Sequence, residues 1–180
     1  MNTELLTDRL RLRRWREDDL AAMTELFAKP EVWYYPLRRA FTSDESGAFL
    51  TRMLDRQRTS TPCPFAAETR DGGVLIGYVG LSVPTFLPEI MPSVEIGWRL
   101  DPRYWGQGLA TEGAMAVLPY AFEDVGLGEL VSIFEPENRS SGNVMRRIGM
   151  HFDRDTTHPD DQNPLRVFRL SREQWLSQAS

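Results

Sequence analysis

Hydrophobic positions near the N-terminus follow first a strand pattern and then a helical one. Between Leu5 and Trp15 leucines alternate with arginines, which predicts a strand with the arginines on a solvated face. Three acidic residues at 17–19 then precede apolar positions three and four apart, which predicts a helix ended by Pro30. A second helix is predicted over residues 43–58, with Ser43 as its cap.

The rest of the chain alternates between strand-like and helix-like segments. Strands predicted at 65–69 and 74–83 flank Arg70-Asp71-Gly72-Gly73, a turn sequence typical of a β-hairpin. Pro119 predicts a kink in the helix that ends near residue 125. Further strands are expected at 94–100, 129–134, 150–155 and 165–170, with helices at 141–148 and after Ser171. This order predicts an α/β fold of the mixed type, in which helices flank a central, mostly antiparallel sheet within one domain over residues 1–180.

Composition and charge narrow the classes of function. A net charge of −5 disfavours nucleic acid as a partner, because phosphate backbones are bound by clustered basic residues. The longest uncharged run, over residues 72–88, is too short and too rich in glycine to predict a membrane span. Two histidines and the single Cys63 give no metal-ligand pattern, and one cysteine fits a reducing compartment. We therefore expect a soluble cytoplasmic protein without a metal.

The most informative segment is a glycine loop before the predicted helix. It reads Arg103-Tyr104-Trp105-Gly106-Gln107-Gly108 and continues into Leu109-Ala110-Thr111. Glycines spaced in this way let backbone N–H groups converge, and the helix that follows adds its own unpaired N–H groups. This arrangement predicts an anion site for a phosphate or pyrophosphate.

Three other interpretations of the loop fit less well. A Walker loop requires a lysine that is absent here, and a dinucleotide fingerprint requires a third glycine where this chain has Thr111. A plain strand-to-helix turn needs one glycine and gains nothing from the arginine and glutamine around it.

Arg103-x-x-Gly106-x-Gly108, after the strand-like Val94–Leu100, resembles the acetyl-CoA pyrophosphate loop of the GNAT superfamily of N-acetyltransferases. The segments at 7–13, 76–80 and 138–150 resemble the ribosomal-protein-alanine N-acetyltransferase branch, in the expected order. The resemblance implies acetyl-CoA as co-substrate and two splayed central strands that receive its pantetheine arm. The residues it implies as cofactor contacts are Ile96, Gly97 and Trp98 for the arm, Arg103 and Gly106 to Thr111 (Gln107, Gly108, Leu109 and Ala110 included) for the pyrophosphate, and Asn138 and Asn143 on the later helix.

Amine attack on a thioester requires a base and benefits from a proton donor to the leaving thiolate. Glu95 is the candidate base: it points to the opposite face of its strand from the core residues, and the resemblance implies the role because relatives in this branch often have a Glu at the matching place. An ion pair with an arginine such as Arg99 is the alternative. Ser141 is the candidate proton donor or sulfur contact, because the tyrosine that many relatives carry is Met145 here. A simple helix-capping role is the alternative for Ser141, and also for Asn138.

The acceptor side is less clearly marked. Trp33, Tyr34, Tyr35 and His158 are candidate acceptor contacts, and acids near His158 could attract a cationic amine; a solvated loop is the alternative. We expect direct acetyl transfer to a primary amine, either a protein N-terminus or a small molecule. A non-catalytic acyl-CoA-binding module and a nucleotide-dependent oxidoreductase are the alternatives, and the protein is expected to be a monomer or a homodimer.

Overall fold

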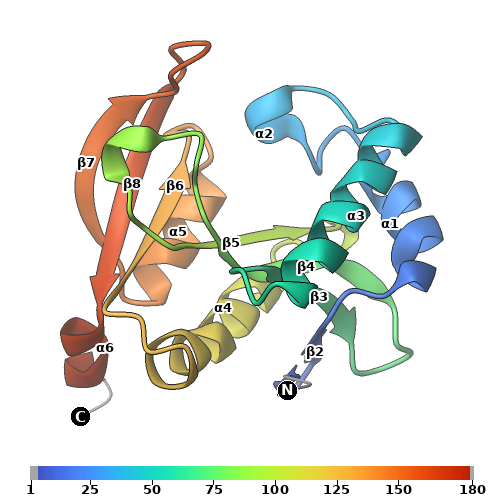
Figure 1. Cartoon of the computed structure of the whole chain (residues 1–180), viewed down its shortest axis with the longest axis horizontal. Helices are drawn as coiled ribbons and strands as arrows, with labels where there is room; N and C mark the ends of the chain where they lie inside the picture. Colours follow the sequence, from blue (N-terminus) through green and yellow to red (C-terminus); the bar gives the residue numbers. More distant parts are fainter. Residues whose placement is uncertain (1–3, 179–180) are drawn as a thin grey trace.

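The computed structural model describes residues 4–178, and its centre is an eight-stranded sheet in the order β1-β2-β3-β4-β5-β6-β8-β7 (Figure 1). Among the described strands only β5 and β6 pair in parallel. The strands are β1 (Leu5–Leu6), β2 (Leu10–Arg13), β3 (Pro64–Thr69), β4 (Leu75–Ser82), β5 (Glu95–Leu100), β6 (Glu129–Phe134), β7 (His151–Thr157) and β8 (Pro164–Ser171). The mixed, mostly antiparallel sheet predicted from the sequence is confirmed.

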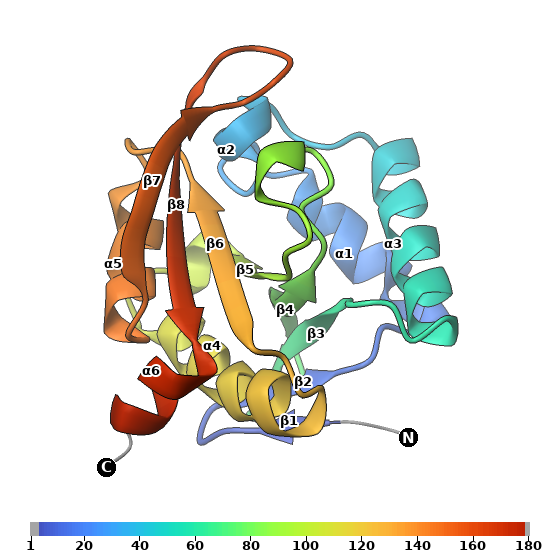
Figure 2. The ribbon, with the colours of Figure 1, turned by 60° about the vertical axis from the view of Figure 1, so that its left-hand side comes forward.

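Helices cover both faces of this sheet, as Figures 1 and 2 show from two sides. Helices α1 and α3 lie on one face, and α4 and α5 lie on the other. The helices are α1 (Leu20–Phe27), α2 (Tyr34–Leu37), α3 (Ser43–Arg58), α4 (Leu109–Pro119), α5 (Arg139–Arg147) and α6 (Arg172–Gln178). The cap of α3 is Thr42 and not Ser43, because the Thr42 hydroxyl accepts from the Glu45 N–H in a capping box.

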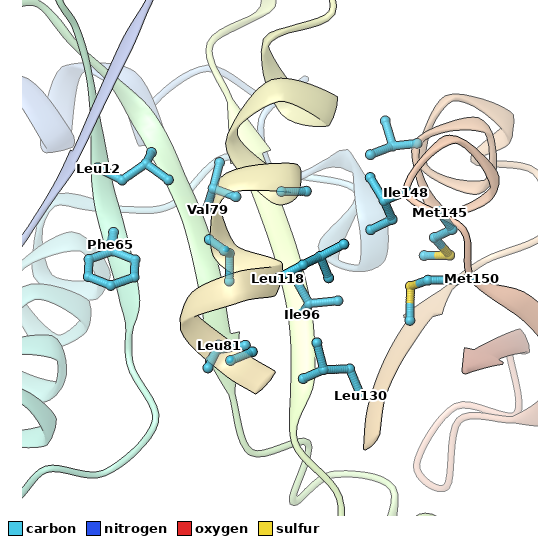
Figure 3. Close-up of a cluster of buried hydrophobic side chains, with 14 of the residues drawn as sticks. Leu12, Phe65, Val79, Leu81, Ile96, Leu118, Leu130, Met145, Ile148 and Met150 are labelled. Carbon is cyan, nitrogen blue, oxygen red and sulfur yellow. The ribbon is translucent and has the colours of Figure 1, made fainter. Parts of the chain in front are cut away.

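The larger core lies between the sheet and the α4–α5 face. Val79 of β4, Ile96 of β5 and Leu118 of α4 meet there, and each is at most 1 % exposed (Figure 3). A smaller aromatic core under α1 and α3 contains Phe27, Trp33 and Phe49. The sheet is therefore held from both sides and can position side chains at its centre.

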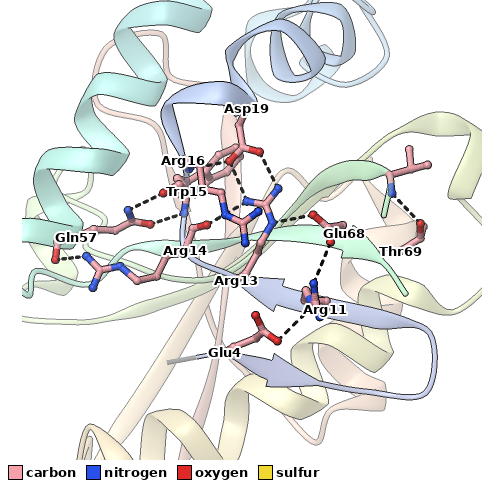
Figure 4. A network of polar contacts seen from close by, with 11 residues as sticks. Glu4, Arg11, Arg13, Arg14, Trp15, Arg16, Asp19, Gln57, Glu68 and Thr69 are labelled. Atoms are coloured by element: carbon pink, nitrogen blue, oxygen red, sulfur yellow. Dashed lines mark hydrogen bonds and ion pairs between the residues drawn. The ribbon is translucent and has the colours of Figure 1, made fainter. Parts of the chain in front are cut away.

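The N-terminal strand differs from its prediction in two ways. It is a hairpin, because the chain turns at Asp8 and the Thr7 N–H donates to the Leu10 carbonyl at 2.9 Å. Its arginines do not all face solvent: the guanidinium of Arg13 is buried and bonds to the carboxylates of Asp19 and Glu68 (Figure 4). The alternation correctly identified the apolar face of the strand. On the polar face, Arg13 can be buried because the carboxylates of Asp19 and Glu68 pair with its charge.

Two central features position the site. Strands β5 and β6 share the single pair Glu95↔Val131 and then separate, which is the splay that the family resemblance implies. On the opposite strand of the gap, the Ser132 hydroxyl donates to the Ile96 carbonyl at 2.8 Å. Pro119 ends the regular part of α4, and residues 120–124 continue as a π-helical turn, so the predicted irregularity occurs at the end of the helix away from the loop.

Candidate active site

A cleft of about 930 Å³ lies at the separation of β5 and β6. Its lining includes Glu95 of β5, Ile133 of β6, Thr111 of α4, Ser141 of α5 and Tyr35 of α2. These residues are far apart in sequence and meet because the splay keeps the middle of the sheet open. The loop between β7 and β8 rises at the same rim of the molecule as α2 (Figures 1 and 2).

The glycine loop at one end of the cleft has the features of an anion site. Gly106 and Gly108 have φ values of 72° and 80°, and a Cβ at Gly106 would meet nothing within 4 Å. Gly108 is the N-cap of α4 and has no side chain to accept a hydrogen bond, so within residues 4–178 the first N–H groups of the helix lack a capping side chain. The buried Thr111 hydroxyl also has no partner among residues 4–178. These donors fit a pyrophosphate.

Side chains from other elements brace this loop. Arg9, in the turn of the N-terminal hairpin, donates to the Gln107 carbonyl at 2.9 Å and pairs with Glu112 of α4 at 2.6 Å. Gln107 in turn donates through its amide to the Arg103 carbonyl at 3.0 Å. The Arg103 guanidinium pairs with buried Asp101 at 2.7 Å, so its side chain is held at the start of the loop in this structure. Of the predicted loop contacts, Gly106 and Gly108 to Thr111 line the cleft.

Glu95 lines the cleft at the point where β5 and β6 separate. The Ser82 hydroxyl donates to its Oε2 at 3.3 Å. Loss of hydration raises the pKa of Glu95 from 4.5 to about 7, although hydrogen bonds from Ser82 and the Ile133 N–H and the charge of Arg99 act to lower it. A carboxyl that is half ionised near neutral pH is suited to accept a proton and release it again.

The alternative role of Glu95, as the ion-pair partner of Arg99, does not describe this structure. The Arg99 guanidinium bonds instead to the Val32 and Tyr35 carbonyls and to the Tyr78 hydroxyl. It also lies 3.9 Å from the centroid of the Trp33 ring. Arg99 therefore anchors α2 and the residues just before it, and among residues 4–178 Glu95 has Ser82 as its side-chain hydrogen-bond partner.

On α5, capping belongs to Asn138 and leaves Ser141 available. The Asn138 Oδ1 accepts from the Ser141 N–H at 3.3 Å and from the Ser140 hydroxyl at 2.9 Å. Both Asn138 and Ser141 line the cleft, as does Asn143, whose Oδ1 accepts from Arg146 at 2.9 Å. The capping alternative thus holds for Asn138 and not for Ser141. The Asn138 amide N–H groups donate to no acceptor in the described part of the chain.

The predicted β5 contacts are arranged in a defined way. Ile96 is fully buried, and Gly97 and Trp98 line the cleft. The Ile96 carbonyl faces β6, as its bond from Ser132 shows, so the backbone groups of Trp98 two residues on face the same gap. The Ile96 carbonyl already accepts the hydrogen bond from Ser132, which leaves Trp98 as the residue whose backbone groups face the gap without such a side-chain bond among residues 4–178.

Of the four residues predicted at the acceptor side, three line the cleft and one does not. Tyr34 and Tyr35 line it, as does His158, which stacks on Phe86 with ring centroids 5.4 Å apart. Trp33 is 8 % exposed and stacks on Phe41 in the smaller core, so the prediction of an acceptor contact at Trp33 is corrected. A run of aromatic residues does not by itself reveal which member turns inward.

The sequence analysis missed two polar residues of the cleft: Ser132, which lies on β6, and Glu135, which directly follows β6. Ser132 interrupts an apolar strand, and Glu135 is buried directly after Phe134. A polar residue inside an otherwise apolar strand was the available signal.

Two properties of the described residues bear on other classes of function. Over residues 4–178, no cluster of three or more His, Cys, Asp or Glu side chains is placed to hold a metal ion. In the same range no helix has the length and apolar character needed to cross a membrane.

Comparison with known proteins assigns the family. Residues 9–151 match the model of the acetyltransferase (GNAT) domain. The chain is 30 % identical to the uncharacterized N-acetyltransferase YnaD of Bacillus subtilis over 146 residues, which is 81 % of each protein. An acetyltransferase structure from Agrobacterium tumefaciens superposes with a TM-score of 0.78 at 27 % identity, covering 96 % of both chains.

The fold is also that of a ribosomal-protein acetyltransferase. The structure of RimL, a ribosomal L7/L12 alpha-N-protein acetyltransferase in complex with coenzyme A, superposes with a TM-score of 0.79 at 14 % identity, over 94 % of this chain and 98 % of that one. The domain match, the named relative and the fold agree, and the chain belongs to the GNAT family of N-acetyltransferases.

Proposed function

We propose that this protein transfers the acetyl group of acetyl-CoA directly to a primary amine, with Glu95 as the general base. The observation that carries the proposal is the position of Glu95, whose pKa is raised to about 7, at the parting of β5 and β6. The same cleft contains the glycine loop at the start of α4, so an anion held there and an amine near Glu95 occupy one continuous space.

The cofactor side of the proposal rests on unpaired donors. The uncapped N-terminus of α4 and the Thr111 hydroxyl would hold the pyrophosphate, and the backbone of Trp98 and the Asn138 amide would hold the pantetheine arm. RimL, which shares the fold, is bound to coenzyme A in its structure. Acetyl-CoA would supply an activated acetyl thioester at the splay.

The chemical roles of the side chains follow from this placement. Glu95 takes a proton from the acceptor ammonium, and the amine nitrogen forms its bond to the acetyl carbon while the carbon–sulfur bond breaks. The thiolate that leaves takes a proton from Ser141 or from solvent. By accepting this proton, Glu95 raises the fraction of the acceptor amine that is neutral, and therefore nucleophilic, beside the acetyl thioester.

The acceptor is a protein N-terminus or a small amine, which would enter beside α2 and the β7–β8 loop, where Tyr34, Tyr35 and His158 line the cleft. The proposal is tested by thiol release from acetyl-CoA with a panel of amines and N-terminal peptides, with the acetylated product identified by mass. Amine-dependent release supports it.

A non-catalytic acyl-CoA-binding module is the second candidate, because the glycine loop and the donors at the start of α4 could bind acyl-CoA without any transfer of its acyl group. Saturable binding of acetyl-CoA without release of thiol to any amine would favour that function and overturn the proposed one.

A further inference from the structure

Glu135 is a buried carboxylate whose hydrogen bonds are incomplete. It follows β6 directly, lines the cleft and is 6 % exposed. Its Oε2 accepts from the Arg38 guanidinium, whereas its Oε1 is buried without a partner among residues 4–178. An unpaired buried carboxylate oxygen is costly to keep, so a donor that is not part of the described chain is the simplest way to satisfy it.

The surroundings of Glu135 form an enclosure suited to a cation. The Arg38 guanidinium carbon lies 4.7 Å from the ring centroids of both Tyr34 and Tyr35. The two rings are nearly perpendicular, at 87°, with their centroids 4.9 Å apart. Two aromatic faces and a carboxylate are the usual partners of a desolvated cation, and here they hold the chain's own arginine.

This enclosure lies on the same side of the sheet as the proposed base. Glu95 is paired with Val131 in the register of β5 and β6, so the two side chains lie on the same face of the sheet. Every second residue of a strand shares a face, which puts residues 133 and 135 on that face too. Four residues separate Val131 from Glu135, which is roughly 13 Å along an extended strand. Glu95, Glu135 and both tyrosines line one cleft, so a single extended molecule could contact the two carboxylates.

We propose that Glu135, Tyr34 and Tyr35 form a second acceptor subsite, which binds a cationic group at the far end of an acceptor whose primary amine is acetylated at Glu95. The proposal deepens the proposed function and rests on it. The acceptor class is therefore a flexible molecule with two separated positive charges, such as a linear diamine.

Arg38 occupies this subsite when no acceptor is present. It is the residue after α2, with a left-handed φ of 59°, and its side chain is 38 % exposed. Because Oε1 is enclosed, the acceptor cation must displace or push aside the Arg38 guanidinium. Arg38 thus competes with the acceptor cation for Glu135, whereas Glu135 attracts that cation. Removing Arg38 should therefore raise kcat/KM for diamines, and removing the charge of Glu135 should lower it.

The test compares a series of α,ω-diamines with alkyl monoamines of the same length, measured as kcat/KM with saturating acetyl-CoA. The variants are Glu135→Gln, which keeps the shape of the side chain, and Arg38→Met, which removes the competing charge. Glu123→Gln is the matched control, because Glu123 is exposed in the π-helical turn after α4 and does not line the cleft. Melting temperatures with and without diamine give a readout that does not require transfer.

The wild type is expected to favour diamines over monoamines by roughly tenfold or more, the scale of one charged hydrogen bond. Glu135→Gln should abolish this preference by lowering kcat/KM for diamines to the level of monoamines, Arg38→Met should increase the preference, and Glu123→Gln should do neither. Equal losses for both amine classes in Glu135→Gln and Arg38→Met would assign the pair a purely structural role and overturn the subsite.

Other outcomes are equally decisive. A wild-type preference for ω-aminocarboxylates would mean that Arg38 binds the acceptor, and it would also overturn the proposal. Acetylation of monoamines without any diamine preference refutes the subsite alone. Absence of transfer to every amine refutes the proposed function, and a diamine-induced rise in melting temperature that Glu135→Gln removes would still support the cation subsite.

Discussion

The Ser132 hydroxyl donates a hydrogen bond of 2.8 Å to the Ile96 carbonyl at the point where β5 and β6 separate. In a continuous parallel ladder this carbonyl would accept from a backbone N–H of β6. The side chain replaces that bond, so the sheet can open at its centre without leaving a buried carbonyl unpaired. Ser132 thereby stabilises the open geometry on which the cleft depends.

Replacing Ser132 with alanine should lower the free energy of unfolding by about 1–3 kcal/mol, the cost of leaving a buried acceptor without a donor. Urea denaturation measures the change. Thr51→Ala is the control, because the exposed Thr51 hydroxyl also donates to a carbonyl, that of Gly47, at 3.0 Å. Equal effects of the two substitutions would argue against this role for Ser132.

Arg9 connects the N-terminal hairpin to the glycine loop through the Gln107 carbonyl and Glu112. Arg9→Met should raise the KM for acetyl-CoA by about three- to tenfold, because the loop loses its brace, and should leave kcat within about twofold. Steady-state kinetics measure both constants. Arg11→Met is the matched control on the same hairpin, since Arg11 pairs with Glu4 and Glu68 and not with the loop. An unchanged KM in Arg9→Met would contradict the bracing role.

Arg13 lies between the carboxylates of Asp19 and Glu68, at 2.7 and 2.8 Å, with little exposure to solvent. These hydrogen bonds raise the pKa of Arg13 well above its ordinary value, although burial opposes the rise. Arg13→Met should destabilise the fold by about 3–5 kcal/mol, because it removes the buried guanidinium that pairs with both carboxylates. Thermal or urea unfolding checks this, and a loss no larger than that of Arg11→Met would be inconsistent with it.

Patterns local to the sequence predicted the elements well. Three predicted features occur as expected: the hairpin at residues 70–73, the strand at 129–134 and the helix after Ser171, whose hydroxyl accepts from the Gln174 N–H at 3.1 Å. Each depends on neighbouring residues, through turn conformation, alternation or a cap. Alternation also predicted the face of Glu95, and the family resemblance made that residue the candidate base.

What the sequence could not predict depends on distant partners. The burial of Arg13 requires Glu68, and the diversion of Arg99 from Glu95 requires the Val32 and Tyr35 carbonyls. Trp33 lies in the core because Phe41 stacks on it, which no spacing rule indicates. Such pairings are set by packing in three dimensions, and only the fold reveals them.

Glu95 should make stability depend on pH. Because its pKa is raised in the fold from 4.5 to about 7, the folded protein retains a proton in this window that the unfolded chain releases. Stability is therefore lost as the pH rises from about 4.5 to 7. Glu95→Gln, which stays neutral, should be more stable than the wild type at pH 8 by up to about 3 kcal/mol, at 1.36 kcal/mol per pKa unit.

Urea denaturation at pH 4 and pH 8 measures this difference, which should nearly vanish at the lower pH. Ser82→Ala is a companion variant, because it removes a hydrogen bond that lowers the pKa of Glu95 and should shift the window upward. A Glu95→Gln protein that is less stable than the wild type at pH 8 would refute a destabilising carboxylate.

The most direct test of the account is the pH dependence of kcat/KM for amine acetylation in the wild type and in Glu95→Gln. The wild-type value should rise with pH up to an inflection near 7, where Glu95 becomes ionised. Glu95→Gln should be slower by about 10²–10⁴ at pH 7, should lose that inflection and should recover partly at high pH, where the amine deprotonates without help. A variant with wild-type rates and the same inflection near pH 7 would contradict the assignment of Glu95 as the base.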